Sequence, residues 1–225
     1  GFTSKQAMDA LKEVAAEVLP DDMTTSWNAM SFQEEKASGS LGVILTFSLV
    51  FVFLILAAQY ESWSLPFAIL LGTPFAIFGA LAFLFVARQF SITFENNIFA
   101  QVSFVMLIGM AAKNAILIVE FANDEFQKGL SLFDAAVKAA KSRFRPILMT
   151  AFSFILGVFP LVIATGTGAE ARKVMGMALL GGMTVATILG VFFYPMLFIL
   201  IGKIAKYEEK RDKQKLVEST VKTEE

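Results

Sequence analysis

Five long stretches of the chain contain almost no charged side chains, and short charged segments separate them. Each stretch is 24 to 29 residues long, and only the third is interrupted, by Lys113. About 20 apolar residues in a helix cross the roughly 30 Å hydrocarbon core of a bilayer. Five buried helices of this length in a soluble protein would need a much larger protein around them. We therefore predict an all-α polytopic membrane protein with five transmembrane helices, at about 37–60, 64–87, 97–121, 146–166 and 174–202.

Residues 1–36 have a different pattern, typical of a water-exposed fold. Apolar residues recur at helical spacing over Ser4–Val18, which predicts an amphipathic helix. Residues 23–30 are expected to form a short strand. Ser31, with Glu34 three positions later, forms a capping box that begins the next helix. Because one helix and one strand do not make a domain, we expect this segment to end an α+β domain that continues upstream.

A second amphipathic helix is predicted at 131–142, between the third and fourth spans. Ser131 and Asp134 are expected to cap its first turn. We expect its apolar residues to face the bilayer from the membrane surface; they are Leu132, Phe133, Ala136, Val137 and Ala140. The tail at 203–225 mixes charges of both signs and is predicted to be a frayed helix.

The basic residues predict the orientation, because cytoplasmic loops carry an excess of Lys and Arg. Six lie on the N-terminal side of the membrane and twelve on the other side. We therefore expect residues 1–36 outside the cytoplasm, and the tail at 203–225 inside it. The six are Lys5, Lys12, Lys36, Arg88, Arg172 and Lys173; the twelve are Lys128, Lys138, Lys141, Arg143, Arg145 and seven in the tail.

Composition excludes most kinds of enzyme. The chain has no Cys and no His, which removes thiol catalysis, Ser-His-Asp hydrolysis and His-ligated metal sites. Hydrophobic residues make up 56% of the chain and charged residues 17%, and the net charge is -1. No basic field therefore indicates nucleic acid. We expect a protein that is not an enzyme and that binds no nucleic acid, metal or cofactor.

Small residues and prolines inside the spans indicate how the helices pack. Small residues recur every four positions from Ala178 to Gly190 on the last span, and at Ser153 and Gly157 on the fourth. This spacing lets two helix backbones approach closely, and compact bundle packing is sufficient to explain it. Pro74, Pro160 and Pro195 lie inside spans and can kink their helices.

Lys113 is the most informative residue, because it lies inside the third span. A Lys at the centre of a membrane helix costs roughly 2.5–3.5 kcal/mol on insertion. Its side chain could snorkel to the surface, but the small residues around it favour a helix buried in protein. Asn114 adds a polar group at the same depth. Such a Lys is a candidate ion or proton site, and we expect its carboxylate partner on a segment outside this chain.

Arg143 and Thr150 form a second polar pair, near the start of the next span. They are seven residues apart, so they share a helix face and differ by about 10 Å in depth. Two interpretations stay open at this point. The pair belongs to the same site as Lys113, or Arg143 is an interfacial anchor and the Thr150 hydroxyl bonds to its own helix.

Four longer motifs stand out along the chain. They are Ser-Phe-Gln-Glu-Glu-Lys at 31–36, Ala-Ala-Gln-Tyr-Glu-Ser-Trp-Ser at 57–64, Gly-Met-Ala-Ala-Lys-Asn-Ala-Ile-Leu-Ile-Val-Glu-Phe at 109–121 and Arg-Phe-Arg-Pro-Ile-Leu-Met-Thr at 143–150. They resemble the resistance–nodulation–division efflux pumps, most closely the hydrophobe/amphiphile multidrug class. The resemblance runs from Gly1 to about Ile204. It implies the C-terminal part of such a pump, with helices eight to twelve of twelve and, at 1–36, the end of the last periplasmic porter subdomain.

The resemblance also implies a function. Members of this family are proton/drug antiporters of the bacterial inner membrane that export hydrophobic and amphiphilic compounds. They are homotrimers that dock a periplasmic adaptor protein and an outer-membrane channel, and the proton gradient drives them. The implied topology places the N-terminal segment in the periplasm and the tail in the cytoplasm.

The resemblance further assigns a proton relay. The position matching Lys113 pairs with two aspartates on helix four, and those matching Arg143 and Thr150 belong to the same relay; Asn114 is a weaker candidate. Proton entry neutralises the aspartates, Lys113 reorients, and the helices shift. Because the aspartates lie outside this chain, we expect no transport by the chain alone. Exporters of metal ions or lipids from the same superfamily, and a passive channel or scaffold, remain alternatives.

Overall fold

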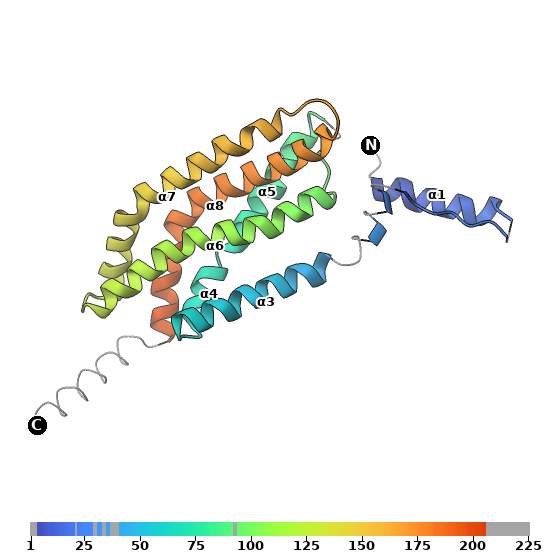
Figure 1. The fold of residues 1–225 in the computed structure, drawn as a ribbon. Coiled ribbons are helices and arrows are strands. Elements are labelled where there is room, and N and C mark those ends of the chain that lie inside the picture. Colours follow the sequence, from blue (N-terminus) through green and yellow to red (C-terminus); the bar gives the residue numbers. More distant parts are fainter. Residues whose placement is uncertain are drawn as a thin grey trace, which may run out of the picture.

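The computed structural model describes residues 4–20, 22–28, 31–32, 35–36, 41–91 and 94–205. These residues form α-helices and no strand (Figure 1). Five segments among them are long and apolar enough to cross a membrane, which confirms the predicted all-α polytopic fold. The helices are α1 (Ser4–Val18), α3 (Leu41–Tyr60), α4 (Leu65–Leu70), α5 (Thr73–Arg88), α6 (Ile98–Gln127), α7 (Leu132–Val162) and α8 (Ala169–Ile204).

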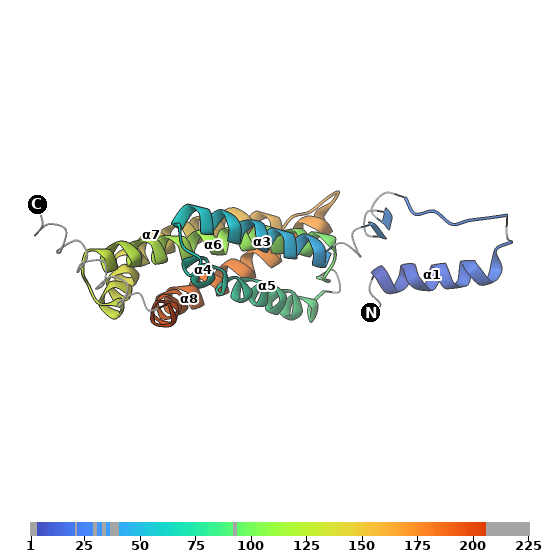
Figure 2. The same ribbon diagram turned by 90° about the horizontal axis from the view of Figure 1, so that it is seen from below.

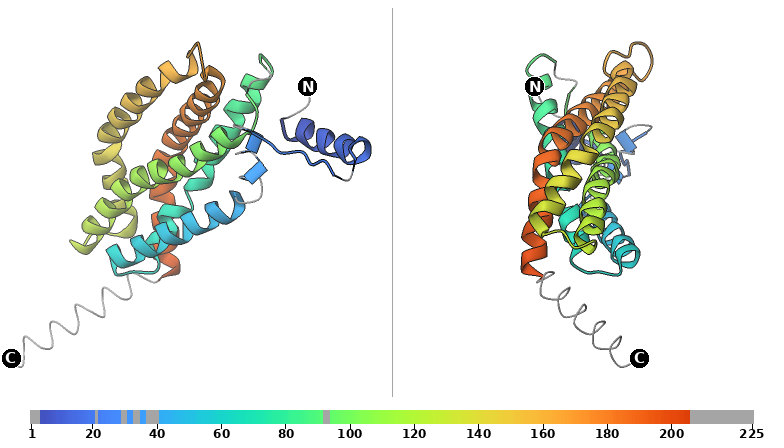
Figure 3. Two further views of the ribbon diagram at one scale, coloured as in Figure 1. Left: turned by 45° about the vertical axis from the view of Figure 1, so that its right-hand side comes forward. Right: turned by 90° about the vertical axis from the view of Figure 1, so that its left-hand side faces the viewer.

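Helix α8 is the centre of the bundle and has its largest contacts with α5, α7 and α6. Helix α3 lies at the edge, where it contacts mainly α4 and α6 (Figure 2). Turned views show α1 beyond the end of the bundle at which α3 begins (Figure 3). The pattern of contacts makes α6 and α8 the helices most enclosed by the others.

The small residues of α8 form a packing seam, as predicted. A Cβ atom at Gly182 would lie 2.3 Å from Leu107 Cδ1 of α6, and one at Gly181 would lie 2.3 Å from Phe83 Cβ of α5. These distances are far below van der Waals contact, so only glycine allows this approach. The row on α7 behaves differently, since no described atom lies within 4 Å of a Cβ at Gly157.

The predicted span at 64–87 is two helices, α4 and α5, with a break at Leu71 and Gly72. Pro74 contributes to the break, because it has no N–H to donate to the carbonyl of Leu70 four residues earlier. The Thr73 hydroxyl donates to that carbonyl instead, at 2.8 Å. Backbone hydrogen bonds still cross the break, from the Leu71 amide to the Phe67 carbonyl at 3.0 Å and from the Gly72 amide to the Ile69 carbonyl at 3.3 Å, and the Thr73 hydroxyl adds to them.

The structure has one continuous helix, α7, where the sequence predicted separate helices at 131–142 and 146–166. Ser131 caps α7 as predicted and accepts a hydrogen bond from the Asp134 amide at 3.1 Å. The expectation that Leu132 and Ala136 face the bilayer is wrong: both are buried in a cluster with Phe126. The physical reason is that α6 runs six residues past the predicted end at 121 and offers them a protein surface.

The remaining boundaries differ in smaller ways. Helix α8 extends past the predicted 174–202 at both ends, and α3 begins at Leu41, with 37–40 outside the described residues. Residues 23–28 form no strand, because a strand needs a partner to pair with. The rest of that prediction, the Glu34 half of the capping box and the tail after 205 lie outside the described residues.

Candidate functional site

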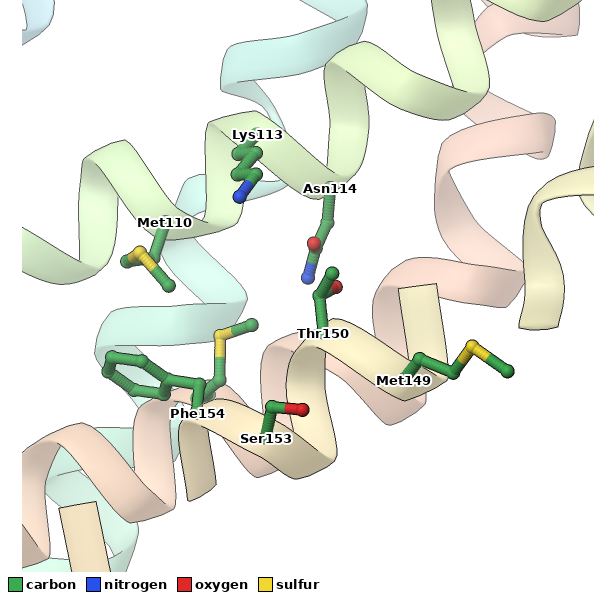
Figure 4. Close-up of a pocket in the computed structure, with 8 residues that line it drawn as sticks. Met110, Lys113, Asn114, Met149, Thr150, Ser153 and Phe154 are labelled. Atoms are coloured by element: carbon green, nitrogen blue, oxygen red, sulfur yellow. The ribbon is translucent and has the colours of Figure 1, made fainter. Parts of the chain in front are cut away.

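A cavity of about 370 Å³ opens between α6, α7 and α8 (Figure 4). It brings together three of the four residues assigned to the relay from the sequence: Lys113, Asn114 and Thr150. Most of the remaining wall is apolar. The other lining residues are Met110, Met149, Ser153, Phe154 and Met183.

Helix α6 presents Lys113 to this cavity. The helix starts at an Asn97 cap, whose side chain accepts hydrogen bonds from the amides of Phe99 and Ala100 at 3.1 and 3.2 Å. Ala112 next to Lys113 is buried against the other helices, whereas Lys113 is exposed. Figure 4 shows its ammonium group pointing into the space between α6 and α7. Among the described residues, no carboxylate forms an ion pair with it.

Asn114 supplies a second unmatched donor beside Lys113. Its side chain is 3% exposed, and its Nδ2 has no hydrogen-bond partner among the described residues. A buried donor without an acceptor costs about 1–3 kcal/mol. Figure 4 shows its amide pointing towards Thr150 of α7. The cavity therefore offers two donors, one of them charged, and it suits an acceptor that carries negative charge.

The Thr150 hydroxyl is occupied within its own helix, because it donates to the Ile147 carbonyl at 3.0 Å. This is the second of the two interpretations left open for Thr150. The oxygen keeps its lone pairs, so it can still accept a hydrogen bond from a group in the cavity.

Arg143 does not line the cavity. Its guanidinium lies 4.7 Å from the centroid of the Phe121 ring, in a cation–π arrangement between α7 and α6. Its Nε is buried and has no hydrogen-bond partner among the described residues. The structure thus separates Arg143 from Lys113, Asn114 and Thr150, and the role of all four in a proton relay stays a prediction.

A sequence model of the AcrB/AcrD/AcrF family matches residues 1–202. The chain belongs to this family. Its membership confirms the resemblance to resistance–nodulation–division efflux pumps that the four motifs carry.

Relatives of this AcrB/AcrD/AcrF family member are named for toluene efflux, multidrug resistance and multidrug export. The chain is 42% identical over 204 residues to the toluene efflux pump membrane transporter TtgB of Pseudomonas putida, covering 91% of the chain and 19% of the relative. It is 43% identical over 202 residues to the multidrug resistance protein MdtF of Escherichia coli, covering 89% and 19%. The multidrug export protein AcrF of Escherichia coli is 42% identical over 207 residues, covering 92% and 19%. The chain thus spans about a fifth of the length of these relatives.

The structure also contains a charged cluster, around Glu125, that was not predicted from the sequence. Glu125, whose side chain is 6% exposed, accepts hydrogen bonds from Lys128 at 2.9 Å and from Lys138. Lys138 lies on α7, so the cluster ties the end of α6 to the start of the next helix. The one signal in the sequence is the three-residue spacing of Glu125 and Lys128, which is common on exposed helix faces and therefore not specific.

Proposed function

We propose that the chain is the C-terminal part of a bacterial inner-membrane proton/drug antiporter that exports hydrophobic and amphiphilic compounds. Three observations support this. The chain belongs to the AcrB/AcrD/AcrF family, and its relatives are named for toluene efflux, multidrug resistance and multidrug export. Five segments of the described residues are long and apolar enough to cross a membrane. The observation that carries the proposal is the cavity in which Lys113 has no ion pair, and Asn114 Nδ2 no hydrogen-bond partner, among the described residues.

The proposed mechanism depends on the charge of Lys113. In a low-dielectric bundle an ammonium group is stable only when it is paired, so a segment of the pump outside this chain supplies carboxylates. Protonation of these carboxylates removes their charge and releases Lys113. The released ammonium moves towards another acceptor, and the Thr150 oxygen lies on the same cavity. Helices α6 and α7 then shift relative to each other, and the proton gradient drives the change without a cofactor.

The proposed assembly follows the family. The chain works with the rest of the pump in a homotrimer that docks a periplasmic adaptor protein and an outer-membrane channel. Residues 1–36 lie in the periplasm and the tail after α8 lies in the cytoplasm. The excess of basic residues on the side of the tail supports this orientation.

Substitution of Lys113 in the full-length transporter tests the proposal. Lys113→Ala removes the switchable charge without adding bulk, and we expect it to abolish dye efflux and antibiotic resistance. Lys113→Arg should also be severely impaired, because a planar guanidinium does not reproduce a compact ammonium group. Thr150→Ala should weaken transport, and Arg143→Ala should have an effect between those of Thr150→Ala and Lys113→Ala.

The matched control is Lys203→Ala, which removes the same charge from an exposed position at the end of α8. It should leave efflux unchanged. Membrane protein levels and trimer formation are measured in parallel, so that a loss of protein is not counted as a loss of function. Resistance near the wild-type level for Lys113→Ala at equal expression would contradict the proposal and favour a passive channel or scaffold.

A further inference from the structure

Tyr194 of α8 is the largest of the fully buried side chains, at 1% exposure. Its hydroxyl donates a hydrogen bond to another helix, at the backbone carbonyl of Ala111 on α6, with a distance of 3.3 Å. Ala111 lies two residues before Lys113, on the same turn of α6. The contact therefore joins the centre of the bundle to the segment that carries the cavity lysine.

The Tyr194 ring is held between two glycines. A Cβ at Gly72 would lie 2.0 Å from Tyr194 Cε1, and a Cβ at Gly190 would lie 2.6 Å from Cε2. No real side chain tolerates such distances, so the ring occupies the space that both glycines leave free. Gly72 lies in the break between α4 and α5, so the ring also contacts the one interrupted span.

Close to the Tyr194 ring, the α4–α5 segment and α8 each lack one helical backbone hydrogen bond. At the break between α4 and α5, Pro74 has no N–H, so the carbonyl of Leu70 lacks its helical backbone donor. Pro195 follows Tyr194 directly and leaves the carbonyl of Val191 without its helical donor. Tyr194 thus bridges two deformable points and the backbone beside Lys113.

We infer that Tyr194 is a positioning residue that sets the place of Lys113 relative to α5 and α8 through its hydrogen bond to Ala111. The inference rests on the proposed function. When Lys113 loses its carboxylate partner and α6 shifts, the hydroxyl must release or follow the Ala111 carbonyl. The ring transmits that movement to the break at Gly72 and to the turn of α8 that contains Pro195.

The expected consequence is a change in the pH dependence of transport. Without the hydroxyl, Lys113 is held less firmly and pairs less well with the carboxylates of the rest of the pump. Those carboxylates then take up protons at higher pH, because a nearby cation is what favours their charged form. Among the described residues, no titratable side chain of α7 or α8 lines the cavity with Lys113, so none of them opposes this shift.

Tyr194→Phe in the full-length transporter tests the inference, since it keeps the ring and removes the hydroxyl. Efflux is measured in proteoliposomes across a pH series, with melting temperature and membrane level recorded. The pH midpoint should rise by about half a unit to one unit, which is what a hydrogen bond of ordinary strength can produce. The matched control is Thr187→Val, which removes a buried hydroxyl of the same helix that donates only to Met183 of α8, at 2.7 Å. It should leave the midpoint unchanged.

Gly72→Ala is the second variant, because it keeps the hydroxyl and crowds the ring. It should shift the midpoint as well, and the double variant with Tyr194→Phe should shift it by less than the sum, since both act on one contact. A wild-type midpoint for Tyr194→Phe, an equal shift for Thr187→Val or strict additivity would each overturn the inference. It is also overturned if neither Tyr194→Phe nor Gly72→Ala accumulates while Thr187→Val does, because Tyr194 then serves folding.

Lys113→Ala distinguishes this inference from the proposed function. If Lys113→Ala is inactive and Tyr194→Phe keeps the wild-type midpoint, the proposed function stands and only the positioning role fails. If Lys113→Ala transports normally, both fail together.

Discussion

Gly181→Ala provides a direct test of how α5 and α8 pack. The added Cβ would lie 2.3 Å from Phe83 Cβ, 2.4 Å from Phe83 Cγ and 2.8 Å from the Gly79 carbonyl oxygen. Carbon atoms in contact are about 3.5–4.0 Å apart, so the two helices must separate by more than about 1 Å. A rotamer change does not relieve this, because two of the three atoms are a backbone oxygen and a Cβ. Overpacking of this kind costs about 1–3 kcal/mol.

Gly157→Ala on α7 is the matched control, because no described atom lies within 4 Å of its added Cβ. There the substitution should stabilise the helix by up to about 1 kcal/mol, through the higher helix propensity of Ala. The two variants should thus differ by about 1–4 kcal/mol in the free energy of unfolding. The assay is SDS titration of the 225-residue chain in detergent, followed by circular dichroism. If Gly181→Ala is as stable as Gly157→Ala, the close approach of α5 and α8 is wrong.

Three further predictions concern topology, activity and stability. In the full-length transporter, Gln89→Cys should react with an impermeant thiol reagent in intact cells. Ser62→Cys should react only after permeabilisation, and the opposite pattern would reverse the orientation. The 225-residue chain alone should give no dye efflux above background in proteoliposomes, because Lys113 lacks its partners; efflux there would favour a self-contained channel. Glu125→Gln should lower the thermal midpoint of the chain more than Glu120→Gln, since Glu125 is buried under two lysines and Glu120 is exposed. Equal midpoints would show that the cluster does not stabilise the α6–α7 connection.

The spans were predictable because charge is excluded from the hydrocarbon core, whatever the helices pack against. The effect of each proline on its helix was not predictable from the sequence. Pro160 and Pro195 lie inside continuous helices, whereas Pro74 lies next to a break. The difference lies in tertiary contacts: at the break, the Tyr194 ring fills the space beside Gly72, and no local pattern encodes that fit.

The helix predicted at 131–142 is a second case in which the sequence pattern does not reveal what the helix packs against. Its cap at Ser131 forms as predicted, but of the predicted apolar face only Leu132 and Ala136 are buried, and Phe133 is 64% exposed. An apolar face, however, packs equally well on lipid or on protein, and the sequence contains no signal that distinguishes them. The extension of α6 to Gln127 decides the matter in favour of protein. Likewise, Lys113 was identifiable by its cost in a membrane, whereas the position of Arg143 on Phe121 depends on two helices.

The rows of small residues differ from helix to helix in what lies beside them. On α8 another helix occupies the space beside the row, because Leu107 of α6 packs against Gly182. On α6 and α7, Gly109 and Gly157 are exposed, and no described atom lies within 4 Å of either Cβ position. Ser153, which forms the row of small residues on α7 together with Gly157, lines the cavity that holds Lys113. A helix carrying the proposed carboxylates therefore has room to approach closely at the place where the unmatched ammonium group needs them, so one surface can satisfy both packing and charge.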